Sequence, residues 1–179
     1  MRTTTIAVTA IAAGAAWLTW EGIRLALTDV SASGCSSPSE LAGDAAFAIA
    51  GLLMGLALLG LAGQVAGLPR LFALSGGIGA AVFGLANGVE HCAFEPFFLL
   101  YALGGLVFVV STAILGVSVL VSGALSRWLG VLLVVAALAP MMLSFDRGGA
   151  ALGGAAWLVL GVALLVVPVW TSPRPDPGR

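Results

Sequence analysis

The residues best able to do chemistry lie in one short stretch, Asn87 to Glu95. It reads Asn-Gly-Val-Glu-His-Cys-Ala-Phe-Glu and holds the only histidine, one of the two cysteines and two of the eight acidic residues of the chain. A carboxyl group in apolar surroundings keeps its proton to higher pH and can act as an acid, and a nearby histidine can relay protons. Glu90 and His91 are therefore candidate acid–base residues. For His91 alone, a structural position at the membrane surface beside a loop is the simpler interpretation.

A further candidate acid, Glu21, lies within the long apolar run from Ile6 to Leu27. Ionisable groups inside a membrane span are costly and by default suggest a functional site. Trp17, Glu21 and Arg24 follow the spacing that places residues on one face of a helix. Glu21 and Arg24 are three residues apart, so they can also pair with each other. For Arg24 we favour structural pairing, and for Glu21 a position facing a cavity.

These residues and their neighbours define one predicted site, with aromatic side chains as its walls. The candidate catalytic residues are Glu21, Glu90 and His91, and the candidate binding residues are Trp17, Trp20, Arg24, Asn87, Phe94, Tyr101 and Asp146. No metal site is expected, because one histidine with two glutamates offers too few ligands of the zinc type. No cofactor is expected either, since the chain has no phosphate loop and no nucleophile motif.

The two cysteines, Cys35 and Cys92, lie in the first and second loops on the same predicted side of the membrane. Two thiols that face each other outside the cytoplasm usually form a disulfide. We therefore predict a Cys35–Cys92 disulfide, with two free thiols as the alternative.

The composition predicts the environment of these residues. Of the 179 residues, 60% are hydrophobic and only 8% are charged, whereas soluble chains carry about 25% charged residues. The apolar runs are unbroken rather than alternating, so the spanning elements are helices. The net charge of −1 argues against a nucleic-acid partner. All basic residues are arginine, which we interpret as the coding bias of a GC-rich bacterium.

The apolar runs predict an all-α polytopic membrane protein, a compact bundle of six transmembrane helices in a single domain over residues 1–170. The helices are expected at about 6–27, 41–66, 71–91, 97–121, 127–144 and 149–170, followed by a disordered tail at 171–179. Five of the seven arginines lie on one side if the chain begins inside. Because arginine favours cytoplasmic loops, both termini are predicted to be cytoplasmic, in an inner (plasma) membrane.

Small residues four apart, such as Gly51 with Gly55, Gly84 with Gly88 and Gly149 with Gly153, predict close helix packing. The pair Trp20-Glu21 resembles that of small membrane-bound terpene cyclases over these two residues only, and no residue role is transferred from it.

The predicted function is an extracytoplasmic-side pocket within the membrane for a hydrophobic small molecule, a lipid or an isoprenoid. If the protein is an enzyme, isomerisation, cyclisation or hydrolysis suits these groups, because none of these reactions needs a cofactor here. The alternative is a non-catalytic transporter unit or an accessory subunit of a larger membrane complex. The expected partners are membrane lipids, the hydrophobic molecule itself and either further copies of the chain or the other subunits of such a complex.

Overall fold

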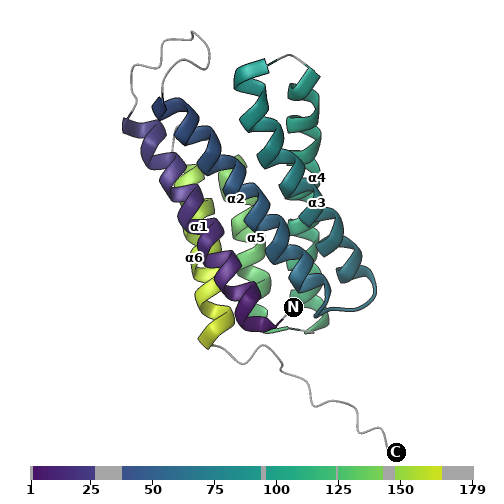
Figure 1. The fold of residues 1–179 in the computed structure, drawn as a ribbon. Coiled ribbons are helices and arrows are strands. Elements are labelled where there is room, and N and C mark those ends of the chain that lie inside the picture. The colour runs from purple at the N-terminus through teal and green to yellow at the C-terminus, as the bar shows by residue number, and fades with distance from the viewer. Residues whose placement is uncertain (1, 27–37, 94–95, 124, 143–147, 167–179) are drawn as a thin grey trace, which may run out of the picture.

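The computed structural model describes residues 2–26, 38–93, 96–123, 125–142 and 148–166, with the backbone alone at 39–40, 88–93 and 96. The regular secondary structure of this part of the chain is all helical, as Figure 1 shows. The helices are α1 (Thr3–Ala26), α2 (Pro38–Ala62), α3 (Leu68–Ala93), α4 (Pro96–Ser122), α5 (Arg127–Met142) and α6 (Gly149–Val166).

Five of these helices are long and apolar enough to cross a bilayer; α5, with 16 described residues, is shorter. A helix needs about 20 apolar residues to span the hydrocarbon core. Their outward faces carry large exposed apolar side chains, such as Leu56, Ile78 and Val159. Such a surface is stable in lipid rather than in water, so the fold is that of a multi-pass membrane protein.

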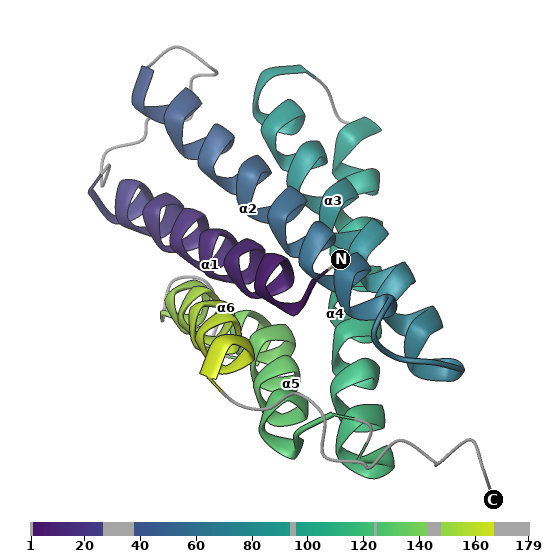
Figure 2. The same cartoon turned by 60° about the horizontal axis from the view of Figure 1, so that its bottom comes forward.

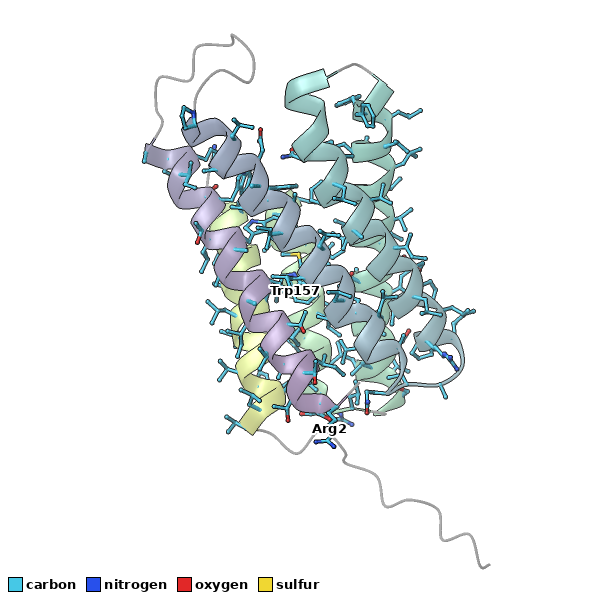
Figure 3. The ribbon with its side chains drawn as sticks, viewed as in Figure 1. Arg2 and Trp157 are labelled. Atoms are coloured by element: carbon cyan, nitrogen blue, oxygen red, sulfur yellow. The ribbon has the colours of Figure 1, made fainter. Side chains whose placement is uncertain are left out.

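The helices form a closed ring in the order of the sequence. Each helix packs mainly against the helices before and after it in the chain, and α6 closes the ring against α1 (Figure 2). Consecutive helices run in opposite directions, so α1, α3 and α5 all begin at the same end of the bundle (Figure 1). Arg2 lies at that end, whereas Trp157 lies midway along the bundle (Figure 3).

Glycine allows neighbouring helices to touch backbone to backbone. A Cβ atom added to Gly51 of α2 would lie 2.6 Å from the Cα of Gly84 in α3, and one added to Gly14 of α1 would lie 2.6 Å from the carbonyl oxygen of Gly154 in α6. In lipid, helices associate through such close packing because apolar side chains gain nothing by leaving the lipid. Gly51 and Gly84, both expected at packing faces, thus face each other.

The helix boundaries differ from the expected ones by up to four residues. The helix α2 ends at Ala62 rather than near residue 66, because the chain turns there through hydrogen bonds from Gly63 N to Gly60 O and from Gln64 N to Leu61 O. Gly67 has a φ of 66°, which glycine adopts without steric cost. This turn lets α3 begin at Leu68 instead of 71. The expected end of α6 at 170 and the tail at 171–179 lie outside the described residues.

Candidate functional site: a side pocket between α4 and α5

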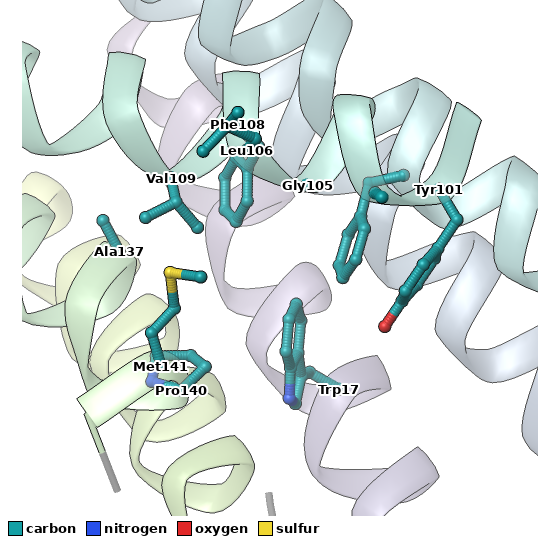
Figure 4. Close-up of a pocket in the computed structure, with 11 residues that line it drawn as sticks. Trp17, Tyr101, Gly105, Leu106, Phe108, Val109, Ala137, Pro140 and Met141 are labelled. Carbon is teal, nitrogen blue, oxygen red and sulfur yellow. The ribbon is translucent and has the colours of Figure 1, made fainter. Parts of the chain in front are cut away.

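A pocket of about 400 Å³ opens on the side of the bundle, in the half away from the N-terminus of α1. Figure 4 shows it in close-up. Its walls come from α1, α3, α4 and α5, far apart in the sequence. The residues that line it are Trp17, Phe83, Tyr101, Ala102, Gly105, Leu106, Phe108, Val109, Ala137, Pro140 and Met141. The volume falls within the range of about 300–1,000 Å³ that is typical of sites for small molecules.

Aromatic side chains form the inner wall of the pocket. The ring centroids of Phe83 and Tyr101 are 4.8 Å apart and nearly parallel, and those of Trp17 and Phe83 are 6.4 Å apart. Phe47 of α2 packs behind them, 5.0 Å from Phe83. Contacting aromatic rings of this kind stabilise each other beyond their burial. The wall is therefore a rigid, preformed apolar surface.

The mouth of the pocket faces outward between α4 and α5. Ala102, Leu106 and Met141 are exposed, whereas Phe108 and Pro140 are buried. Elsewhere the two helices are in close contact, since a Cβ atom added to Gly116 would lie 2.8 Å from the carbonyl oxygen of Gly130. This lateral mouth opens on the same surface that lipid covers, so a hydrophobic molecule can enter from the membrane.

Pro140 shapes the α5 side of the mouth. It lies inside the helix and has no N–H to donate to the carbonyl of Ala136, which weakens the last turn of α5. Its ring packs on α6 at Gly153, where an added Cβ atom would lie 2.7 Å from the Pro140 Cγ. Pro140, Met141 and Ala137 lie together on one side of the pocket, opposite Trp17 and Tyr101 (Figure 4).

Glu21 lies one helical turn beyond Trp17 and is buried, with 3% of its surface exposed. Arg24 donates two hydrogen bonds to it, from Nε to Oε2 at 2.8 Å and from Nη2 to Oε1 at 2.9 Å. The guanidinium side chain is more exposed than the carboxylate, 31% against 4%. The pair is thus held in the two-point geometry typical of arginine and carboxylate, and it does not line the pocket.

Asn87 of α3 is also buried, with 8% of its surface exposed. It follows Phe83, which lines the pocket, by one helical turn, but it does not itself line the pocket.

The structure thus places several of the predicted site residues inside the ring. Trp17 and Tyr101 line the pocket, and Trp20 packs beside them with its ring centroid 6.1 Å from that of Trp17. Glu21 and Arg24 pair with each other on α1, beyond Trp17, and Asn87 lies one turn beyond Phe83 on α3.

The other predicted residues are not brought into this site. Glu90, His91 and Cys92 lie on α3, where the structure describes the backbone alone, and Cys35, Phe94 and Asp146 lie outside the described residues. The roles of these residues and the Cys35–Cys92 disulfide therefore stay predictions. Within the described residues no group of three His, Cys, Asp or Glu side chains is placed to hold a metal ion.

Apart from Tyr101, the part of the pocket that α4 and α5 build was not predicted from the sequence. Phe108, Gly105 and Met141 lie in helices that are apolar on every side, so nothing in their spacing marks an inner face. The one available signal was Pro140, since proline inside an apolar helix marks an interruption of the backbone hydrogen bonds.

Comparison with known proteins gives no further guide to this site. The chain matches no protein-family model, and searches of curated proteins and of solved structures find no significant similarity.

Proposed function

We propose that the chain is an inner-membrane protein of six spans that binds one hydrophobic small molecule, a lipid or an isoprenoid, in the side pocket between α4 and α5. The observation that carries the proposal is the pocket itself, about 400 Å³ in volume and lined by aromatic and aliphatic side chains. Apolar lining excludes a charged or strongly hydrated ligand, because burying an ion without a partner is costly. The lateral mouth suits a molecule dissolved in the bilayer.

The orientation that we propose puts both termini in the cytoplasm and the pocket in the extracytoplasmic half. Arg2, Arg70 and Arg127 belong to the end of the bundle where α1, α3 and α5 begin, and positive residues favour the cytoplasmic side. Fusing a reporter enzyme that is active only outside the cytoplasm after the α1–α2 loop tests this arrangement. Activity of the reporter at that loop supports it, and activity only after the α2–α3 turn contradicts it.

We assign Glu21 to a structural pair with Arg24 rather than to acid catalysis. Both of its oxygens accept hydrogen bonds from Arg24, whereas an acid catalyst must hold a proton that it can give to the substrate. This arrangement favours a protein that binds, carries or presents the molecule over an isomerase, cyclase or hydrolase that depends on Glu21. An accessory subunit of a larger complex remains consistent with such a binding role.

Purification in a mild detergent, followed by extraction and mass spectrometry of what stays bound, tests the proposal. Ala102 lies on the exposed rim, so Ala102→Trp should fill the mouth without entering the buried core. Leu103 is the matched control, because it is the next residue, is exposed, and does not line the pocket. We expect one class of hydrophobic molecule bound to the unaltered protein and to Leu103→Trp, and much less to Ala102→Trp. Equal retention by all three proteins would overturn the proposal.

A further inference from the structure

Aromatic rings of similar orientation form one side of the pocket. Of the eleven residues that line it, four are aromatic, whereas aromatic residues make up only 8% of the chain, so rings are concentrated at this cavity. The plane of the Phe83 ring makes an angle of 30° with that of Trp17 and of 26° with that of Tyr101. Phe108 is closer still to parallel with Phe83, at 16°. The four rings therefore share one general orientation.

A second layer of rings supports this wall. Phe47 of α2 meets Phe83 edge to face, with ring centroids 5.0 Å apart and planes at 63°. Trp157 of α6 stacks on Phe108, with centroids 6.3 Å apart. Neither of these supporting residues lines the pocket. Because contacts between aromatic rings favour particular geometries, the second layer holds the wall rings in their common orientation.

Gly105 of α4 leaves the Phe83 ring open to the pocket. Gly105 itself lines the cavity, and a Cβ atom added to it would lie 3.0 Å from Cδ2 and 3.1 Å from Cε2 of Phe83. A side chain at this position would cover the ring. Since glycine has none, a bound molecule can approach the Phe83 ring from the α4 side.

The opposite wall of the pocket also suits an aromatic ring. Met141 and Pro140 of α5 face Trp17 across the cavity (Figure 4). A methionine sulfur makes favourable contacts with aromatic rings, and the unbranched side chain adapts to the shape of its neighbour. A ring bound in the cavity would thus have aromatic side chains on one side and the Met141 thioether on the other.

We propose that the side pocket selects a hydrophobic molecule that carries a flat conjugated ring, of aromatic or quinone type, on its hydrocarbon tail. This inference rests on the proposed function and names the ligand class. A flat ring can stack on wall rings of common orientation, and such contacts stabilise beyond the burial of the surface. A saturated chain or a puckered saturated ring gains the burial alone.

The test uses two ligands that differ only in the ring, dodecylbenzene and dodecylcyclohexane. The saturated ring has the larger apolar surface, so burial alone favours dodecylcyclohexane. Both are added together to the intact chain in detergent after removal of co-purified lipid, and the molecules retained by the protein are extracted and counted by gas chromatography with mass spectrometry. Dividing the retained ratio by the ratio in free micelles corrects for partition into detergent. We expect dodecylbenzene to be enriched about threefold, the value of one aromatic contact.

Two variants locate the preference. Phe83→Leu and Tyr101→Leu each remove one wall ring but keep an apolar side chain, and each should bring the enrichment towards one. Phe72→Leu is the matched control, because Phe72 lies on α3 like Phe83, packs partly buried against the core and does not line the pocket. This control should keep the enrichment of the unaltered protein. Folding of each variant is checked by its helicity.

The outcomes separate this inference from the proposed function. If the unaltered protein retains the two compounds in the ratio of the free micelles, the aromatic wall does not select a flat ring, although the pocket still binds hydrophobic molecules. The same conclusion follows if both ring variants keep the full enrichment, or if Phe72→Leu loses it as well. If neither compound is retained, or if Ala102→Trp does not lower the retention of either, the pocket itself is not a ligand site and the proposed function fails as well.

Discussion

Replacing Gly79 with alanine should loosen the bundle beside the pocket. Gly79 lies where α3 meets α4, and a Cβ atom added there would be 2.6 Å from the backbone nitrogen of Phe108 and 2.9 Å from the carbonyl oxygen of Gly104. Non-bonded carbon contacts are ordinarily about 3.5–4.0 Å. The two backbones must therefore separate by about 1 Å, and Phe108, which lines the pocket, must move with α4.

The expected cost follows from this clash. Forcing a methyl group into a closely packed interface costs about 1–3 kcal/mol, and here the neighbours are backbone atoms that cannot rotate away. The matched control is Gly22→Ala on α1, because Gly22 is exposed and a Cβ atom there would meet nothing within 4 Å. In a helix, alanine is favoured over glycine by up to about 1 kcal/mol. The control should be neutral or stabilising.

Both variants are measured by unfolding in mixed micelles with increasing sodium dodecyl sulfate, followed by circular dichroism. The Gly79→Ala protein should unfold at a lower detergent fraction and retain less of the bound hydrophobic molecule. If Gly79→Ala and Gly22→Ala unfold at the same fraction of sodium dodecyl sulfate and retain equal amounts of the molecule, the close contact of α3 and α4 does not stabilise the pocket.

Further substitutions test other parts of the structure by the same assays. Arg24→Met should destabilise by about 3 kcal/mol because it leaves a buried carboxylate unpaired, and adding Glu21→Gln should recover most of that loss; an additive double-mutant cycle would contradict the pairing. Ser111→Ala should cost only about 0.6 kcal/mol, since it removes one hydrogen bond of 2.9 Å between α3 and α4. Met141→Ala should widen the mouth and speed ligand exchange, whereas Met142→Ala, exposed and outside the pocket, should not; equal exchange rates would argue against entry at the α4–α5 mouth.

The helices and some of the residues inside the bundle could be predicted from the sequence, because polar groups are costly in lipid. A long unbroken apolar run can cross the bilayer as a helix, because a helix satisfies its own backbone hydrogen bonds. Six helices were therefore expected, and six are described. A polar residue within such a run is costly in lipid and therefore faces inward. For Glu21 this argument favoured a position facing a cavity, and the side chain is buried but does not line the pocket. Trp17 was identified because it shares a helix face with Glu21.

The ring order and the α4–α5 wall were not predictable in the same way. In α4 nearly every residue is apolar, so the spacing of apolar residues does not show which ones face inward. Phe108 is buried and its neighbour Val107 is exposed, although both are apolar. Helix packing in lipid depends on shape rather than on hydrophobicity. The shape is set by pairs of glycines from different helices, such as Gly116 with Gly130, and one sequence alone does not say which glycines meet.

Photo-crosslinking tests the central claim most directly. A long-chain alkylbenzene with a diazirine in its hydrocarbon tail is added to the protein in bilayers, irradiated, and located by mass spectrometry of peptides. The account predicts labels concentrated on residues 101–109 and 137–141, with strong loss in Ala102→Trp and none in Leu103→Trp. Labels spread evenly over the outward faces of the helices, unchanged by Ala102→Trp, would contradict it.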